Sequence, residues 1–557
     1  MGFLSGSGGT ASLVADTEVV ESGAIAAPST GSIGALSEIG ARRLNPRWML
    51  AAVLLVLAAQ NMLLWRFLDF APAWLYALAL ALFAGVAWFI IRSPAMADWQ
   101  GPTLRGLLFL AGIAILIFLL GGEGRLFYAN ADWQVRDAVQ HDLTLYPWPY
   151  AYNFEGQIEL IRAPIGMYLI PAIVGKAFGP KAVDAALLIQ NSLLLTLLLG
   201  LGSTMFVDTR AKIRALVVVV FFSGMDIIGQ LLRSNASGEP LPDHLERWAG
   251  SQFSSHITQA FWVPQHALAG WFGALLFLLW RERRISLGQM YAPVPLLMLL
   301  SPLGVMGTLP FAAYAGIATV LRRELKAGDV LLPALTTILA APAILYLGAA
   351  GESVGIHLLQ MNFVMYLLFE ILEVVPFAAG VALINRSNRS ELATLLLVGA
   401  CLVIAPLVQI GEGMDFTMRV SIPALAILAV QVAWSLDRAA RSGGDHRPAR
   451  MMLIVTLLVG SVTGAFEIAR ALTHYPSPRI HCNLTSAWYR VVDLPKVSTN
   501  AAYFARAEAL PPMMRPRISF IAETEPGPCW DRRWEVARFT PPKHGAAGCH
   551  FRFRHSD

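Results

Sequence analysis

Apolar runs about as long as a bilayer is thick recur along the whole chain. A helix needs about 20 mostly apolar residues to cross the hydrocarbon core of a membrane. Eleven runs come close to that length, namely 48–66, 73–91, 105–120, 182–206, 213–232, 262–280, 330–348, 362–384, 391–409, 420–436 and 450–467. The sequence therefore predicts an all-α, polytopic transmembrane helix bundle.

The amino-acid composition supports this prediction. Hydrophobic residues make up 56% of the 557 residues and charged residues only 14%, whereas an average soluble protein carries roughly 25% charged residues. A water-soluble chain of this size would need more charge to cover its surface. Lys and Arg also form no stripe interleaved with aromatic residues, so we expect no nucleic-acid partner.

A further apolar stretch, 291–321, is interrupted at residues 301–304 and 307–310, where Ser, Pro and Gly gather. It is too long for one helix and short for two full spans. We expect two short helices that meet at this turn, which a membrane tolerates only where protein packs around the broken backbone. With these two helices, the expected number of spans is about 13.

The basic residues predict the orientation of the spans. Lys and Arg gather in seven clusters between the apolar runs, namely 42–47, 92–105, 210–214, 281–284, 322–326, 386–389 and 438–450. Basic clusters that flank spans face the cytoplasm. We therefore expect a multi-pass protein of the plasma (inner) membrane, with a cytoplasmic N-terminus and an extracytoplasmic C-terminus. The loops 121–162 and 410–419 then lie outside.

One apolar segment does not fit this alternation as a span. Residues 121–162 are predicted to be external and residues 208–214 internal, so an odd number of crossings lies between them. Two apolar segments, 163–178 and 182–206, occupy this interval. The first is short and carries two prolines, so we interpret it as an interfacial or re-entrant helix. The alternative is that it crosses the membrane and another span is misassigned.

Composition divides the chain into three parts. Residues 1–46 are rich in Gly, Ser and Ala, which predicts a disordered cytoplasmic tail. Residues 47–470 hold the spans. Residues 471–557 carry Pro, aromatic and Arg residues with three cysteines, which predicts a small extracytoplasmic domain. A disulfide is permitted in that compartment, and Cys529 with Cys549 is the simplest pairing, which leaves one cysteine over.

The external loop 121–162 concentrates acids, a histidine and aromatic residues. If its middle is helical, Asp132 and Arg136 lie on one face, and Asp137 and His141 lie on another, each pair four residues apart. Two interpretations are open. The loop is either an ordinary interfacial segment, whose Trp and Tyr side chains lie at headgroup level, or part of a functional site.

A second candidate segment, 410–419, lies on the same predicted side. It carries Glu412, Asp415 and Arg419 just before a span. Arginine binds phosphate well because its planar guanidinium donates two parallel hydrogen bonds and stays charged. The segment is therefore a candidate anion site near headgroup depth. The alternative is an arginine that anchors the helix end by snorkelling to the interface.

A third polar feature opens the outer end of the span 262–280. Gln265 and His266 follow Pro264 within the first turn and a half of the expected helix. They could orient a substrate or cap the helix, and a packing role is the alternative.

Three carboxylates, Asp226, Glu370 and Glu373, fall inside apolar runs. A charge at the centre of a span costs ~2.5–3.5 kcal/mol on insertion scales. We expect these side chains to face a polar cavity or to lie near a helix end.

Short segments of the chain are similar to those of a known family. Residues 162–166, Arg-Ala-Pro-Ile-Gly, are similar to the His-Pro-Pro-x-Gly segment of protein mannosyltransferases and aminoarabinose transferases, but lack its His-Pro pair. Residues 262–271 (WVPQHALAGW) and 414–425 (MDFTMRVSIPAL) look like segments of bacterial multi-pass proteins with this layout. With the acidic external loop and the array of spans, residues 105–435 resemble the GT-C superfamily of integral membrane glycosyltransferases, which use polyprenyl-phosphate sugars.

The resemblance implies a GT-C-like fold and an inverting transfer of a sugar from a polyprenyl-phosphate donor to a cell-envelope acceptor, on the extracytoplasmic side. The implied partners are the lipid-linked sugar, a glycan or lipid acceptor, and membrane lipid. Asp132 would take the acceptor proton as general base, with Asp137 as the second choice. The implied substrate-binding residues are Arg419, Asp415, Arg162, His266 and Gln265.

The leaving phosphate also needs a cation in such a reaction, either Arg419 or a divalent metal ion held by external carboxylates. His141 and Asp142, together with Asp137, are the candidate metal ligands, and their spacing is not specific for a metal. No other cofactor is implied.

Two other classes of protein stay open. A transporter or flippase for a lipid-linked or small substrate often has repeated halves with broken helices at the midplane. Here a single broken pair is predicted, at 291–321. The third class is a noncatalytic envelope-assembly subunit, in which residues 471–557 would be the interaction module.

Overall fold

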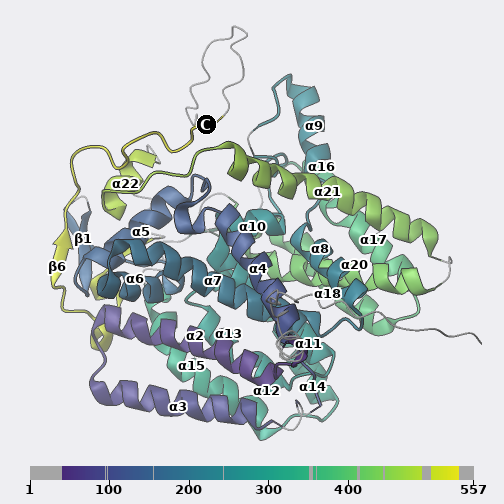
Figure 1. The fold of residues 1–557 in the computed structure, drawn as a ribbon, viewed down its shortest axis with the longest axis horizontal. Helices are drawn as coiled ribbons and strands as arrows, with labels where there is room; N and C mark the ends of the chain where they lie inside the picture. The colour runs from purple at the N-terminus through teal and green to yellow at the C-terminus, as the bar shows by residue number, and fades with distance from the viewer. Residues whose placement is uncertain are drawn as a thin grey trace, which may run out of the picture. The chain divides into compact units, whose positions relative to one another are not determined.

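Helices make up most of the structure, which confirms the predicted all-α fold. The computed structural model describes residues 40–93, 96, 98–154, 156–242, 244–349, 355–358, 361–410, 414–442, 446–491 and 503–538. Within them, eight helical segments are long and apolar enough to cross a membrane: α2 (Pro46–Leu68), α3 (Ala73–Ile91), α7 (Pro180–Ser203), α14 (Pro302–Leu321), α15 (Ala327–Gly348), α18 with the following 3-10 turn (Arg389–Leu407), α20 (Ile422–Arg441) and α21 (Arg447–Thr473). Figure 1 shows their arrangement.

Shorter helices fill the space between these segments. They are α4 (Leu104–Leu120), α5 (Trp133–Leu145), α6 (Gly166–Phe178), α8 (Thr209–Val220), α9 (Asp226–Ser237), α10 (His256–Trp262), α11 (Pro264–Arg281), α12 (Leu287–Tyr291), α13 (Val294–Leu297), α19 (Asp415–Val420) and α22 (Leu484–Val491). Helix α11 is the most enclosed of them, because every residue from Pro264 to Trp280 is buried. A helix that is apolar on all sides belongs in the interior.

A ninth candidate span is bent. Helices α16 (Phe363–Glu373) and α17 (Val375–Ile384) meet at an angle of 45°. Pro376 lies in the first turn of α17, and proline lacks the amide that would continue a helix. Eight or nine candidates within the described residues are fewer than the 13 spans expected, so that number stays a prediction.

The predicted span 213–232 is wrong as a single helix. The chain forms α8 and α9 there, separated by a turn at residues 221–225. Ser223 donates a hydrogen bond to the Asp226 carboxylate at 2.9 Å. Both side chains are buried. Helix α21 packs on this turn so closely that a β-carbon on Gly460 would stand 2.3 Å from the Ser223 carbonyl. The apolar composition of residues 213–232 gave no sign of this break.

The stretch 291–321 is interrupted at residues 292–293 and 298–301, but not at 307–310. Helices α12 and α13 are short, whereas α14 runs unbroken through residues 307–310. Ser301 caps α14 by accepting a hydrogen bond from the Gly304 amide at 2.8 Å, and α14 has proline at its first position, where proline fits a helix start. The expectation of two short helices is therefore wrong for the second one.

The segment 163–178 forms a short helix, as predicted. Helix α6 is too short to qualify as a span and contains Pro171. The Gly166 amide donates to the Leu299 carbonyl at 3.0 Å, and a β-carbon on Gly166 would stand 2.9 Å from that oxygen. Glycine at this position therefore allows α6 to approach the turn before α14. The interfacial placement of α6 stays a prediction.

A four-stranded sheet joins two parts of the chain that are far apart in sequence. Its strand order is β5-β2-β1-β6. Strands β1 and β2 come from the loop 121–162, and β5 and β6 come from the C-terminal segment. A second sheet pairs two short strands. The bounds are β1 (Tyr150–Phe154), β2 (Gln157–Ile161), β3 (Ile356–Leu358), β4 (Val408–Ile410), β5 (Phe504–Arg506) and β6 (Phe520–Ala522).

This shared sheet constrains the topology. Strand ladders of an open sheet do not run through a bilayer, so the loop 121–162 and the C-terminal segment lie on one side of any membrane that the helices cross. Figure 1 shows β1, β6 and α22 beside α5 and α6. The C-terminal segment belongs to the same compact unit, residues 43–557, as the helices.

The disulfide differs from the expected one. Cys529 is bonded to Cys482, so the expected pairing of Cys529 with Cys549 is wrong, and Cys549 lies outside the described residues. The bond ties the start of α22 to the chain after β6. The tail 1–46 is also outside the described residues up to residue 39.

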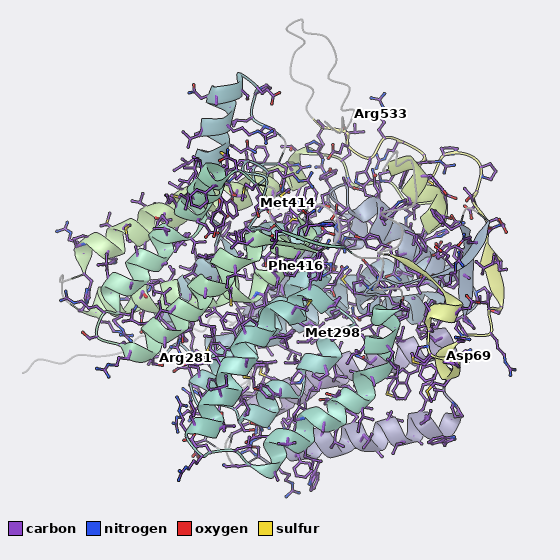
Figure 2. All side chains as sticks on the ribbon, turned by 180° about the vertical axis from the view of Figure 1, so that it is seen from behind. Asp69, Arg281, Met298, Met414, Phe416 and Arg533 are labelled. Carbon is purple, nitrogen blue, oxygen red and sulfur yellow. A yellow bond between two sulfur atoms is a disulfide. The ribbon has the colours of Figure 1, made fainter. Side chains whose placement is uncertain are left out.

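Ion pairs fall into two sets, one among segments predicted to be cytoplasmic and one among segments predicted to be external. Pairs between predicted cytoplasmic segments include Arg214–Asp437, Arg281–Glu391 and Arg283–Glu324, and pairs between predicted external segments include Arg66–Asp69, Arg470–Glu535 and Arg479–Asp184. Within the described residues, no ion pair joins one set to the other. Arg281 and Asp69, one from each set, are labelled in Figure 2.

Candidate functional site

Two arginines from distant segments meet on the side of the molecule that carries the four-stranded sheet. Arg136 lies in the first turn of α5, and Arg419 lies in α19, whose Phe416 is labelled in Figure 2. Their charges are close enough to act on each other. Asp132 lies 3.7 Å from Arg136, and Asp415 lies 2.5 Å from Arg419. We call these four residues the paired-arginine site.

The position of α5 follows from contacts at its start. Asn130 and Trp133 both donate side-chain hydrogen bonds to the Phe261 carbonyl at the end of α10, at 2.8 and 2.9 Å. The Asn130 side chain also accepts a hydrogen bond from the Asp132 amide at 3.1 Å. These bonds fix the start of α5, and the helical spacing places Asp132 and Arg136 on one face, as predicted.

Arg136 is held by two neighbours. Its Nη1 donates to the Gln265 side-chain oxygen at 2.5 Å and to the Tyr168 hydroxyl at 3.4 Å. Gln265 was predicted to orient a substrate, and in the structure it orients the guanidinium. Tyr168 of α6 was not predicted, because its place beside Arg136 depends on how α6 packs on α5.

His266 lies next to the same charges. Its Nδ1 is 2.7 Å from the Ser301 hydroxyl, which caps α14. The charges of Arg136 and Arg419 both act on the imidazole ring. The first turns of α11 and α14 therefore form one wall of the paired-arginine site.

A tyrosine of the C-terminal segment completes the site. Tyr503 precedes β5, and the charges of Asp415, Arg419, Asp132 and Arg136 all act on its phenol. The Asp415 carboxylate, followed by burial, raises the pKa of Tyr503 to about 12. The sequence does not single out this residue, since nothing in the order of the aromatic residues in the C-terminal segment distinguishes it.

Arg162 adjoins the site through its backbone. Its amide donates to the Tyr503 carbonyl at 2.6 Å, next to the ladder that β2 forms with β5. The Arg162 charge acts on the Tyr346 phenol of α15. Arg162 thus helps to hold Tyr503 in place.

Asp137 follows Arg136 in the chain but pairs with a different arginine. Its carboxylate lies 3.0 Å from Arg125, which also binds Asp184 at 3.0 Å. Burial raises the pKa of Asp137 to about 6, against the opposing effect of Arg125. Asp137 and Arg136 both line a small cavity of about 20 Å³, which has room for about one water molecule.

His141 and Asp142 lie against the C-terminal segment. His141 Nδ1 is 2.9 Å from one Asp142 oxygen, and the other oxygen accepts hydrogen bonds from the Tyr152 hydroxyl and the Leu484 amide, both at 2.7 Å. Burial raises the pKa of Asp142. Asp142 therefore joins α5, β1 and α22. Within the described residues, no group of three or more His, Cys, Asp or Glu side chains is arranged to hold a metal ion.

The paired-arginine site has the chemistry of an anion site beside a base. Each arginine keeps a buried Nε–H that has no acceptor within the described part of the chain. Asp132 is the most open of the four, with 44% of its side chain exposed against 10% for Arg136, 13% for Arg419 and 32% for Asp415. A substrate can therefore reach the Asp132 carboxylate while two guanidinium groups lie behind it.

Comparisons with known proteins add no family assignment. No family model, curated protein or solved structure matches the chain. The resemblance to GT-C glycosyltransferases therefore rests on the sequence segments named above, and membership of that superfamily stays a prediction.

Proposed function

We propose that the protein is a membrane glycosyltransferase of the GT-C type, which moves a sugar from a polyprenyl-phosphate donor to a cell-envelope acceptor on the extracytoplasmic side of the plasma (inner) membrane. One observation carries the proposal. Asp132, Arg136, Asp415 and Arg419, which come from two segments far apart in sequence, form one partly open cluster. A buried pair of guanidinium groups suits a phosphate group that leaves with its charge.

The proposed reaction requires a base for the acceptor proton and a cation for the leaving phosphate. The acceptor hydroxyl oxygen forms a bond to the anomeric carbon and loses its proton to Asp132. The bond from that carbon to the phosphate oxygen breaks, and the phosphate leaves with the electron pair. Arg419 and Arg136 stabilise this charge where it develops. Asp137 is the weaker choice of base, because its carboxylate is buried and paired with Arg125.

Two further observations support the proposed sidedness and acceptor contact. The ion pairs keep predicted cytoplasmic and predicted external segments apart, and the site contains external segments alone. Tyr503 brings the C-terminal segment against the four charges. Tyr503 is thus in a position to contact an acceptor.

The test measures sugar transfer by the full-length protein in proteoliposomes that contain labelled polyprenyl-phosphate sugars and an envelope extract as acceptor. The variant is Asp132→Asn, and Asp69→Asn is the control, since Asp69 is an exposed external acid paired with Arg66. We expect Asp132→Asn to lower the transfer rate by about 10²–10⁴-fold, as for loss of a general base, and Asp69→Asn to leave it unchanged.

Transfer at the wild-type rate in Asp132→Asn would contradict the role of Asp132 as the general base. Donor that crosses the bilayer without being consumed would instead favour the transporter or flippase.

A further inference from the structure

A second, much larger cavity lies between α4, α7, α8 and α11. Its volume is about 930 Å³, which is at the upper end of the range for small-molecule sites. Along α4 its wall extends from Arg105 to Ile117, about 18 Å at 1.5 Å per residue. It is separate from the paired-arginine site, because none of the four residues of that site lines it.

The charged residues of the cavity gather at one end. Arg43, Arg105 and Lys212 line this end, in segments predicted to face the cytoplasm. Within the described residues none of the three has a carboxylate partner, whereas Arg214, one turn further along α8 than Arg210, pairs with Asp437. Three cations without a carboxylate partner in the described part of the chain thus line this end, which we call the opening.

The acid at this opening does not neutralise the cations. Asp208 lines the cavity and caps α8, where its carboxylate accepts a hydrogen bond from the Ala211 amide at 2.8 Å. The charges that act on it are those of Arg214 and Arg441, on the side of α8 that meets α20. The opening therefore keeps a positive charge.

The remainder of the cavity is mostly apolar, and His256 is its one ionisable residue there among the described residues. Beyond the opening, the wall is formed mostly by aliphatic side chains of α4, α7, α8 and α11, among them Ile117, Leu198, Val219 and Leu275. A cavity that is cationic at one end and apolar along its length matches a molecule with an anionic head and hydrocarbon chains. Basic pockets between helices on the cytoplasmic side of membranes are typical binding sites for anionic lipid headgroups.

We propose that this cavity binds an anionic phospholipid, whose phosphate lies against Arg43, Arg105 and Lys212 and whose acyl chains extend along α4 and α8. The site is distinct from the proposed sugar-transfer site, which belongs to the opposite set of segments. The proposal therefore stands without the proposed function, and its test needs no transfer assay.

The first test is native mass spectrometry of the full-length protein, delipidated in detergent and then titrated with phosphatidylglycerol or phosphatidylcholine. The variants are Lys212→Glu and, as the matched control, Arg210→Glu, since Arg210 is an exposed cation on the same helix and does not line the cavity. We expect the wild type and Arg210→Glu to bind one phosphatidylglycerol at least about 10-fold more tightly than phosphatidylcholine, and Lys212→Glu to lose this preference.

A second variant tests the apolar part without changing charge. A β-carbon on Gly202 of α7 would meet only Leu275 Cδ1, at 3.7 Å, so Gly202→Leu fits locally and extends a side chain into the cavity. Leucine also favours a helix more than glycine does, so the variant is expected to fold. We expect it to lower phosphatidylglycerol binding about as much as Lys212→Glu does.

The proposal is overturned by equal affinity for the two phospholipids, by an equal loss in Lys212→Glu and Arg210→Glu, or by full binding in Gly202→Leu. Preferential binding of a polyprenyl phosphate over phosphatidylglycerol would overturn the choice of occupant.

Discussion

The paired-arginine site and a second cluster of buried charges are built differently. The second cluster, which we call the carboxylate cluster, consists of Asp226, Glu246 and Glu373 with His244 and Glu467. All five are nearly or fully buried. The paired-arginine site has two cations and an open acid, whereas the carboxylate cluster has one histidine among four acids.

Hydrogen bonds connect the carboxylate cluster to neighbouring side chains. Glu373 accepts from the Trp248 indole at 3.1 Å, and Asp226 accepts from Ser223 and Thr463. These bonds join α9 to α21, and α16 to the loop that carries Trp248. Burial of charge alone therefore does not identify a functional site in this protein. The carboxylate cluster is enclosed, whereas the paired-arginine site has an accessible acid beside two guanidinium groups.

The largest expected effect that would sharpen this comparison is a loss of stability. Trp248→Phe removes the indole donor and leaves a buried Glu373 oxygen unsatisfied, which costs about 1–3 kcal/mol. We expect a lower thermal unfolding midpoint in detergent and, for the folded protein, an unchanged transfer rate per molecule. A transfer rate that falls as far as in Asp132→Asn would place the carboxylate cluster in the active machinery.

A smaller effect concerns pH. Burial raises the pKa of Glu246 to about 7, although the His244 charge opposes this. Between about pH 4.5 and 7 the unfolded chain loses a proton that the folded protein keeps, so Glu246 lowers the free energy of unfolding as pH rises, by up to about 1.4 kcal/mol per pH unit.

The pH effect is measured by comparing thermal unfolding of Glu246→Gln and wild type across that range. We expect the variant to lose less stability as pH rises. The effect of Glu246 on His244 has the same sign, because the pKa of His244 is raised in the folded protein and stability from that source is also lost as pH rises. Parallel pH profiles for the two proteins would contradict the buried position of Glu246.

The smallest expected effect tests how the C-terminal segment contributes to the paired-arginine site. Tyr503→Phe removes the hydroxyl on which all four charges act, and we expect the KM for the acceptor to rise about 3- to 10-fold, as for loss of one hydrogen-bonding group, with kcat changed less. Tyr475→Phe is the control, since Tyr475 is an exposed tyrosine of the same segment. An equal effect of both substitutions would indicate a general disturbance of the segment.

The sequence predicts the parts of the site that depend on local spacing. Asp132 and Arg136 follow from helical periodicity, and Arg419 follows from a charged residue at the start of an apolar run. The meeting of these segments was expected from the positive-inside rule, which placed both outside. Tyr503 was beyond this reasoning, because its position depends on the pairing of β2 with β5, and short strands leave no periodic signal.

The same limit explains the errors in the fold. An apolar run shows where a span can exist but not where it turns, so the turn at Ser223 was hidden within 213–232. Gly307 had the opposite effect. It suggested a break, but a β-carbon there would stand 2.1 Å from the Val420 carbonyl, so glycine serves close packing of α14 on α19 and the helix continues.

The most direct test of the central claim is whether Arg136 and Arg419 hold one phosphate together. The measurement is the dissociation constant of a polyprenyl phosphate for the wild type, Arg136→Gln, Arg419→Gln and the double variant, with Arg66→Gln as control. We predict that each single substitution weakens binding about 10-fold or more and that the double variant is much less weakened than the product of the two effects. Independent effects that multiply, or binding that none of the variants weakens, would contradict the account.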